Sequence, residues 1–253
     1  MDRRVAIVTG GGTGIGAAVA RELAGRGMTV AVVGRTPETL EATAAEISRG
    51  PGAGFALVAD LADPKEPGRV VEEVLLHAGR IDVIVNNAAF YRLKLVEEFT
   101  PEDFDSHMAV NLRAPYFLVQ AALPALCKSP SPAVVNISSA AAAMYRPRQT
   151  VYGLTKAGIE HMTKNLAAEL ARYRIRVNAI RPGPVDTPIH RRAVEDPEAR
   201  VRELGKMVPL GRVGQPEEIA WWVGHLVDPK AEWVTGAVFV VDGGRVLGPP
   251  EAI

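Results

Sequence analysis

A strand, a glycine loop and a helix near the start of the chain constrain its fold more than any other stretch. Val5–Thr9 is short, apolar and rich in β-branched residues, which predicts a buried strand. A GGGTGIG loop at 10–16 follows at once, and 17–26 has a helical pattern. In this order the glycines permit a tight turn and a close approach to a pyrophosphate, and the helix N-terminus offers N–H groups to phosphates. The glycines concerned are Gly10, Gly14 and Gly16. A glycine-rich surface turn is the alternative.

The second predicted strand, 28–34, ends where a Rossmann fold selects its coenzyme. An NAD-binding unit usually places Asp or Glu there to hold the ribose 2′-hydroxyl. This chain has Gly34 and Arg35 instead. A guanidinium suits a 2′-phosphate, so we expect NADP(H), with NAD(H) as the alternative. The alternative is that Arg35 only caps the end of the strand in solvent and does not contact a cofactor.

Strands and helices alternate along the rest of the chain. Further strands are predicted at 54–59, 81–85, 133–138, 176–180 and 237–241. Helices are predicted from Pro37, at 64–79, at 100–128 with bends at Pro115 and Pro124, around Tyr152 as far as Tyr173, and at 215–227. We expect an α/β fold: a single Rossmann domain over 1–253, with a doubly wound seven-stranded parallel sheet and helices on both faces. A charge-rich segment predicts a mobile lid at about 188–212.

Polar and small residues follow several predicted strands, at the edge where such sheets bind ligands. Asp60-Leu61 follows the third strand, and Asp60 is expected either to accept a hydrogen bond from an adenine amino group or to form a turn. Asn86-Asn87-Ala88-Ala89 follows the fourth, where small residues permit close approach and asparagines can brace strand ends. Asn111 lies inside a helical pattern, which is unfavourable unless its amide is hydrogen-bonded.

Tyr152 and Lys156 lie four residues apart, on one face of a predicted helix. A tyrosine hydroxyl has a pKa of roughly 10, and a neighbouring cation lowers that pKa. The pair can therefore deliver a proton to a carbonyl oxygen or take one from an alcohol. The spacing also occurs by chance on solvated helices, so its weight depends on the other motifs.

Composition narrows the classes of function. The chain has 29 Lys and Arg and 29 Asp and Glu, so its formal net charge is zero. Nucleic-acid and anionic-membrane partners favour basic surfaces, and we expect neither. Cys127 is the only cysteine and the five histidines form no ligand-like cluster, so we expect no disulfide and no metal site. The apolar run near the N-terminus is too short for a signal peptide or a membrane span, which makes a cytoplasmic location the default.

Together these motifs resemble the short-chain dehydrogenase/reductase family over essentially the whole chain. The resemblance rests on the segment Thr9–Gly16, Asn86-Asn87-Ala88, Asn111, Ser139, Tyr152 with Lys156, and Pro182-Gly183 with Thr187. In length and layout the chain resembles the 3-oxoacyl-carrier-protein reductase branch. That layout is shared by dehydrogenases of sugars, steroids and other alcohols, and the Phe90-Tyr91 pair resembles pteridine reductases faintly.

The resemblance implies a role for each catalytic residue. Tyr152 would be the general acid for carbonyl reduction and the base for alcohol oxidation. Lys156 would lower the tyrosine pKa and bind the nicotinamide ribose, and Ser139, preferred to Ser138 by its spacing from Tyr152, would bind the substrate oxygen. Asn111 would hold a water in a proton relay behind Lys156.

The resemblance also implies a cofactor site and a homotetramer or homodimer. Val185 and Thr187 would bind the nicotinamide carboxamide. The full set of expected cofactor-binding residues is Gly10, Thr13, Gly14, Ile15, Gly16, Arg35, Asp60, Leu61, Asn87, Ala88, Tyr152, Lys156, Pro182, Gly183, Val185 and Thr187. Two departures stand out: Ala89 replaces a frequent glycine, and Thr13 is neutral where NADP-preferring members often carry a basic residue.

The substrate is expected to be a small carbonyl compound or alcohol. We expect it to contact Ser139, Phe90, Tyr145 and His190, and the aromatic side chains predict an apolar pocket unless they belong to the core or to subunit contacts. Arg146 and Arg148 either meet an acidic substrate tail or face solvent. Two other classes of function remain: a nucleotide-sensing protein without turnover, and a purely structural oligomer.

Overall fold

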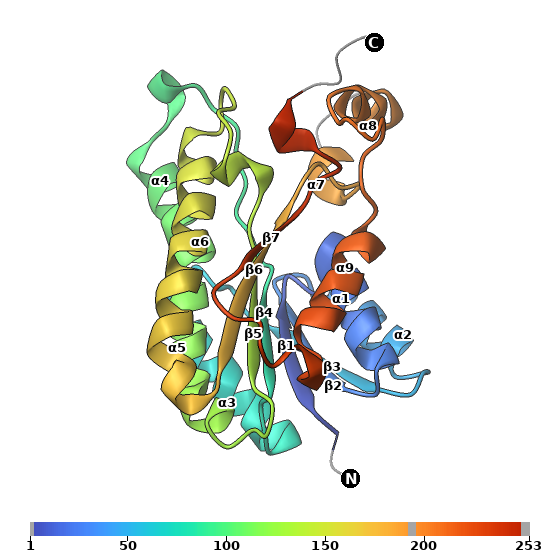
Figure 1. Cartoon of the computed structure of the whole chain (residues 1–253), viewed down its shortest axis with the longest axis vertical. Helices are drawn as coiled ribbons and strands as arrows, with labels where there is room; N and C mark the ends of the chain where they lie inside the picture. Colours follow the sequence, from blue (N-terminus) through green and yellow to red (C-terminus); the bar gives the residue numbers. More distant parts are fainter. Residues whose placement is uncertain (1–2, 192–195, 249–253) are drawn as a thin grey trace.

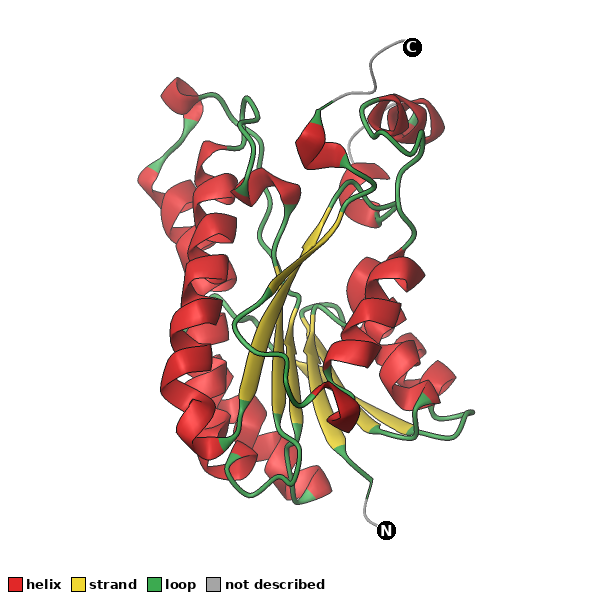
Figure 2. Cartoon of the chain, in the orientation of Figure 1, coloured by secondary structure: helices red, strands yellow, loops and turns green. Residues whose placement is uncertain are grey.

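The computed structural model describes residues 3–191 and 196–248 and has the expected α/β architecture. All seven strands are parallel, in the order β3-β2-β1-β4-β5-β6-β7 (Figures 1 and 2). The strands are β1 Val5–Thr9, β2 Thr29–Gly34, β3 Ala53–Val58, β4 Val83–Asn86, β5 Ala133–Ile137, β6 Arg176–Pro182 and β7 Val238–Val241. The order reverses between β1 and β4, and such a switch point opens a ligand crevice at the carboxyl ends of the strands.

Helices cover both faces of the sheet, and the central strands are accordingly buried and mostly apolar. β1 and β5 are buried along their whole length, as expected for a parallel sheet enclosed on two sides. One face packs against α1 Gly14–Gly25, α2 Pro37–Ile47 and α9 Pro216–Leu226. The other packs against α3 Glu66–Ala78, α5 Ala114–Leu126 and α6 Thr150–Leu170 (Figure 1). The predicted doubly wound fold is confirmed.

The long helix expected at 100–128 is divided by a π-helical turn. α4 Pro101–Met108 leads into η2 Ala109–Arg113, which is π-helical, and α5 then continues the chain. Pro115 lies in the first turn of α5, where its missing N–H costs nothing, and Pro124 lies near the helix end. The interruption falls at Asn111, inside the π turn, and π turns are frequent at functional sites.

The segment expected to form a lid contains two helices above the carboxyl edge of the sheet (Figure 1). They are α7 Pro188–Arg191 and α8 Pro197–Lys206. The described residues also form five short 3-10 turns. They are η1 Val96–Glu98, η3 Ala140–Ala142, η4 Ala171–Tyr173, η5 Pro229–Ala231 and η6 Arg245–Leu247. In the part of the chain that the structure describes, no helix has the length and apolarity needed to cross a membrane.

Candidate functional site

A cavity of about 380 Å³ lies at the carboxyl ends of β1 to β6. It collects most of the residues that the sequence indicated. The expected residues that line it are Gly10, Thr13, Gly14, Ile15, Arg35, Asp60, Leu61, Asn87, Ala88, Phe90, Ser139, Tyr152, Lys156, Pro182, Gly183, Val185 and Thr187. Gly16, Asn111 and Tyr145 are not among the lining residues, and the side chain of His190 lies outside what the structure describes.

The glycine loop is held close to the switch point between β1 and β4. Gly10 has φ +64°, a left-handed conformation that favours glycine. A Cβ on Gly16 would lie 2.1 Å from the Gly10 carbonyl oxygen and 2.6 Å from Asn87 Nδ2, so only glycine fits there. Asn87 Nδ2 donates to the carbonyl oxygens of Thr9 at 2.9 Å and Gly10 at 3.3 Å. Helix α1 therefore begins at the cavity wall.

The N-terminus of α1 and the side chain of Arg35 suit phosphate groups. The Thr13 side chain does not cap α1, and the first turn of this helix contains no acidic residue. Its leading N–H groups thus face the cavity with a partial positive charge. Arg35 is exposed at the cavity wall and, among the described residues, no carboxylate pairs with it. Asp60 Oδ1 accepts from the N–H of Ala62 at 3.1 Å, the turn-forming alternative.

Tyr152, Lys156 and Ser139 meet on the opposite side of the cavity. Helix α6 carries Tyr152 and Lys156, and the Lys156 ammonium lies 5.7 Å from the Tyr152 ring centroid. Lys156 is only 3% exposed, and its Nζ donates to the Ile137 carbonyl oxygen at 2.8 Å. Ser139 lies between β5 and η3 and lines the cavity. Its Oγ accepts a hydrogen bond from the N–H of Ala141 at 3.2 Å.

Burial shifts the pKa values of Lys156 and Tyr152 and so determines which of the two side chains is charged. It lowers the pKa of Lys156 to about 8, so the ammonium still dominates at neutral pH. It raises the pKa of the Tyr152 hydroxyl above its ordinary value, and a hydrogen bond with Ser139 opposes that rise. The sequence suggested that Lys156 would lower the tyrosine pKa, but burial outweighs any such effect here. The hydroxyl is therefore protonated at neutral pH and can serve as an acid toward a carbonyl oxygen.

Ser138 and Ser139 have different surroundings although they are adjacent. Ser138 is buried, donates to Glu160 Oε1 at 2.7 Å and lies 3.2 Å from the Lys156 carbonyl oxygen. Arg181 binds the same Glu160 carboxylate through two hydrogen bonds. Both serines line the cavity. The Ser138 hydroxyl is committed to Glu160 and ties β5 to α6, whereas the Ser139 hydroxyl is the one that hydrogen-bonds with Tyr152.

Asn111 holds the backbone beside the cavity. Its Oδ1 accepts from the N–H of Phe90 at 2.7 Å, and its Nδ2 donates to the Phe90 carbonyl oxygen and to Thr155 Oγ1, each at 3.0 Å. The side chain is 1% exposed, so these bonds supply the partners that a buried amide needs. In this structure the amide fixes the loop after β4 against α6.

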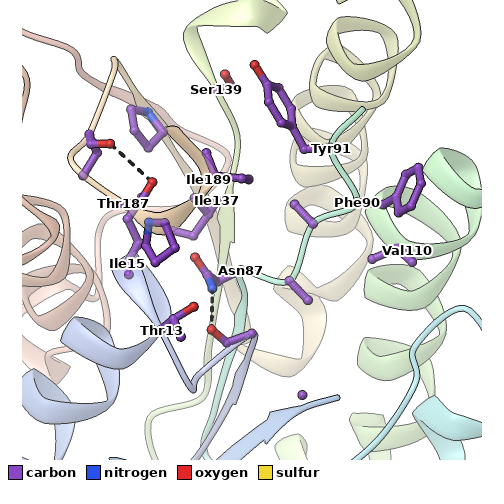
Figure 3. A pocket seen from close by; sticks show the side chains of 18 of the residues that line it. Thr13, Ile15, Asn87, Phe90, Tyr91, Val110, Ile137, Ser139, Thr187 and Ile189 are labelled. Carbon is purple, nitrogen blue, oxygen red and sulfur yellow. Dashed lines mark hydrogen bonds between the residues drawn. The ribbon is translucent and has the colours of Figure 1, made fainter. Parts of the chain in front are cut away.

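That loop directs two neighbouring aromatic rings in opposite directions. Phe90 turns its ring away from the cavity centre, edge-on to buried His107 at 4.8 Å (Figure 3). Tyr91 points toward Ser139, and its ring lies edge-on to that of Tyr152 at 4.8 Å. Gln149 Nε2 donates to the Tyr91 hydroxyl at 2.9 Å. Gln149 is a site residue that sequence reasoning missed, because no motif marks it.

Tyr145, which the sequence predicted as a substrate contact, lies outside the cavity. Tyr145 is 91% exposed and does not line the cavity, since the loop from η3 to α6 turns its side chain into solvent. Arg146, the next residue, does line it. In the loop after β6, Thr187 Oγ1 donates to the Val185 carbonyl oxygen at 3.3 Å (Figure 3).

Fold and site together define a class of protein. A doubly wound parallel sheet with a glycine loop at its switch point is a dinucleotide-binding fold. The protonated hydroxyl and buried ammonium across the same cavity add acid–base chemistry at a carbonyl or alcohol. No group of three or more metal-ligating side chains occurs among the residues the structure describes. The class is a nicotinamide-dependent oxidoreductase.

Comparison with known proteins identifies the family. The family model described as "Enoyl-(Acyl carrier protein) reductase" matches residues 10–245. The 3-oxoacyl-[acyl-carrier-protein] reductase FabG of Thermotoga maritima is 37% identical over 247 residues, covering 98% of this chain and 99% of that protein. The chain belongs to the short-chain dehydrogenase/reductase family, whose members are oxidoreductases of carbonyl and alcohol groups.

Two solved structures share this fold closely. A short-chain dehydrogenase/reductase from Serratia marcescens superposes with a TM-score of 0.89 at 33% identity, covering 96% of this chain and 98% of that one. A blue fluorescent protein from a metagenomic library, solved in complex with NADPH, has a TM-score of 0.87 at 34% identity, covering 96% and 97%.

Proposed function

We propose that this protein is an NADP(H)-dependent oxidoreductase that transfers hydride between nicotinamide and a carbonyl or secondary alcohol, with 3-oxoacyl thioesters as the first substrate class to test. The observation that carries this proposal is the meeting of Ser139, Tyr152 and buried Lys156 on one wall of the cavity, across from the glycine loop.

The proposed chemistry assigns one task to each side chain. Hydride for the carbonyl carbon would come from the nicotinamide when the cofactor is bound. Tyr152 donates its proton to the carbonyl oxygen, and the reverse transfer accompanies alcohol oxidation. Ser139 donates a hydrogen bond to the same oxygen as negative charge develops there. Lys156 stabilises the tyrosinate that remains and contacts the nicotinamide ribose.

Asn111 has a positioning role in this proposal. Its three hydrogen bonds hold Phe90 and Thr155, and therefore the loop and helix that carry Tyr91 and Tyr152. A water in a relay behind Lys156 stays a prediction for this residue. The proposed relay would pass protons from the Lys156 ammonium, which lies 5.7 Å from the centroid of the Tyr152 ring.

The preference for NADP(H) is supported by Arg35 and by one similar protein. The exposed guanidinium lies at the end of β2 without a carboxylate partner among the described residues, where a 2′-phosphate can reach it. The similar metagenomic protein binds NADPH. The glycine loop and α1 would hold the pyrophosphate, Asp60 and Leu61 the adenine, Asn87 and Ala88 the adjoining ribose, and 182–187 the nicotinamide. NAD(H) is the alternative.

The similarity to the Thermotoga reductase supports a 3-oxoacyl thioester as substrate. The proposal of a pteridine substrate rested on the Phe90-Tyr91 pair. It is weaker in this structure because only Tyr91 packs against Tyr152, whereas Phe90 packs against His107. A nucleotide-sensing protein without turnover would have no need of the buried Lys156 ammonium beside Tyr152.

The test is the initial rate of NADPH oxidation with an acetoacetyl thioester, for the wild type and for Tyr152→Phe. We expect turnover by the wild type and a loss of about a hundredfold to ten-thousandfold in the variant, the contribution that general acid catalysis makes. NADPH binding should persist in the variant. If Tyr152→Phe retains the wild-type rate, the catalytic assignment is wrong.

The coenzyme assignment is tested with Arg35→Ser. Removing the guanidinium should raise the KM for NADPH by about tenfold or more and leave the KM for NADH nearly unchanged, since a charge-assisted hydrogen bond is worth about 1.5–3 kcal/mol. Arg49→Ser, a change at an exposed arginine after α2, is the matched control. Equal effects of Arg35→Ser on both coenzymes would contradict the assignment.

A further inference from the structure

Three arginines from distant parts of the chain come together beside the cavity. Arg146 lies in the loop between η3 and α6 and lines the cavity. Arg200 lies on α8, and Arg245 begins η6, the dark red turn after β7 (Figure 1). Arg146 shares the cavity lining with Tyr91 and Tyr152. Burial lowers the pKa of Arg146, and the positive charges of Arg245 and Arg200 lower it further.

The cluster lacks the carboxylates that usually accompany buried arginines. Arg245 is only 8% exposed. Among the residues that the structure describes, its buried Nε has no hydrogen-bond partner and its Nη2 lies 4.0 Å from Met207 Sδ. Within 3–191 and 196–248, no carboxylate forms an ion pair with Arg146 or Arg245.

Other arginines at the same edge are paired. Arg191 binds Asp186 and Glu198, and Arg181 binds Glu160. A buried cation without a partner is costly, so an anion that arrives with a ligand would stabilise these guanidinium groups.

The cluster lies close to the reacting group. The charges of Arg146 and Arg200 act on the Tyr91 hydroxyl, lowering its pKa against the rise caused by burial. The Tyr91 ring in turn contacts Tyr152. Arg146, Tyr91 and Tyr152 line the same cavity, so the Arg146 guanidinium and the proposed proton donor border one space.

The 2′-phosphate of a dinucleotide does not account for these arginines. Arg35 follows β2 and Arg146 follows β5, and three strand spacings, roughly 14 Å in total, separate these strands in the sheet. The two cationic regions thus lie at opposite ends of the cavity, one at the expected adenosine end and one beside Tyr152.

We propose that Arg146, backed by Arg245 and Arg200, binds an anionic group of the substrate, so that this enzyme prefers ketones or alcohols with a carboxylate or phosphate near the reacting carbon. This inference rests on the proposed hydride-transfer function. A guanidinium fork matches both anions. The phosphate of a carrier-bound thioester lies at the far end of a long arm, whereas this cluster adjoins the residue that contacts Tyr152.

The test compares substrates that differ in charge. Acetoacetate is paired with methyl acetoacetate, and dihydroxyacetone phosphate with dihydroxyacetone, in NADPH oxidation assays. We expect kcat/KM to favour the anionic member of at least one pair by about tenfold or more, the effect of one charge-assisted hydrogen bond. The pair that shows the preference distinguishes a carboxylate from a phosphate. A ratio of one or below in both pairs overturns the inference.

Variants locate the effect. Arg146→Gln should bring the anionic-to-neutral ratio toward one, and Arg146→Lys should keep part of it, since the charge remains and the fork does not. Arg172→Gln, at an exposed arginine of η4 beyond the far end of α6, is the control that should leave the ratio unchanged. Arg245→Met, a second variant, replaces the buried partner. An unaltered ratio in both Arg146→Gln and Arg245→Met contradicts the assignment.

A binding measurement separates this inference from the proposed function. Calorimetric titration of the NADPH-saturated Tyr152→Phe variant with each substrate pair does not depend on turnover. Tighter binding of the anionic member, lost when Arg146→Gln is added, supports the anion site even if no ketone is reduced. Turnover of acidic and neutral ketones at equal rates would leave the proposed function intact and refute the anion site.

Discussion

The side chain of Lys156 carries a charge that is almost completely buried. It is 3% exposed and has one hydrogen bond, to a backbone carbonyl. Burying a charge with so little compensation costs stability, and proteins retain such groups at functional sites. The proposed function uses the same charge beside Tyr152, so the cost is tied to the chemistry.

This cost predicts a specific dependence on pH. The pKa of Lys156 is about 8 in the folded protein against 10.5 as the ordinary value, so between these values the unfolded chain binds more protons. Stability of the wild type should therefore rise as pH increases from about 8 to about 10, relative to Lys156→Met, which cannot titrate. The difference in unfolding free energy between the two proteins should shift by an amount on the order of 3 kcal/mol.

Urea denaturation of both proteins at pH 7 and pH 10 measures this shift. Tyrosines and lysines distant from Lys156 titrate alike in the two proteins and cancel from the difference. A stability difference that does not change with pH would show that Lys156 is not held at a lowered pKa.

At the scale of the element, the glycine loop and α1 act as one unit. Gly16 lies against the Gly10 carbonyl oxygen, and Asn87 bonds the loop to the end of β4. Helix α1 is thereby placed with its N-terminus at the switch point, where the sheet topology opens the crevice.

Gly16→Ala and Gly25→Ala test this arrangement within one helix. A Cβ at Gly16 would overlap backbone, so we expect destabilisation of about 1–3 kcal/mol and loss of the thermal stabilisation by NADPH. Gly25 is exposed with nothing within 4 Å of an added Cβ, and its substitution should stabilise the protein by about 0.5–1 kcal/mol and preserve NADPH binding. Differential scanning fluorimetry with and without NADPH compares the two. Normal NADPH stabilisation of Gly16→Ala would contradict the proposed phosphate cradle.

At the scale of the whole molecule, two cores share one sheet. Alternate side chains of the same strands enter the core beneath α1, α2 and α9 and the core beneath α3, α5 and α6. This sharing supports the prediction that 1–253 is a single domain. Closure of α7 and α8 over the cavity stays a prediction for the lid.

The outer surface of α5 bears exposed aromatic side chains. Tyr116 and Phe117 are each 42% exposed, and their rings contact one another. Exposed apolar patches mark association surfaces, and we predict a homotetramer or homodimer that uses this face. Light scattering should give a mass two or four times 27.0 kDa.

Phe117→Glu should lower the mass, because it places a charge in the proposed interface. Leu76→Glu, at an exposed apolar residue of α3, is the matched control and should not. A wild-type mass of 27.0 kDa, or equal effects of both changes, would contradict this prediction.

The sequence by itself determined the alternation of strands and helices, the glycine loop and the placing of Tyr152 and Lys156 on one face of a helix. These follow from periodicity and short spacings, which are local properties of the chain. It predicted helix α6 and its continuation to Tyr173 for the same reason. It also predicted the parallel sheet, because strand–helix alternation leaves few other topologies.

Only the tertiary structure decided how the side chains around the site are oriented and charged. Phe90 and Tyr91 diverge because Asn111, distant in sequence, holds the backbone of Phe90. Burial raises the pKa of Tyr152, which the spacing to Lys156 could not indicate. The cluster of Arg146, Arg200 and Arg245 arises where three separate segments meet at one edge of the sheet. Burial and electrostatics depend on contacts between distant segments, so no local pattern in the sequence encodes them.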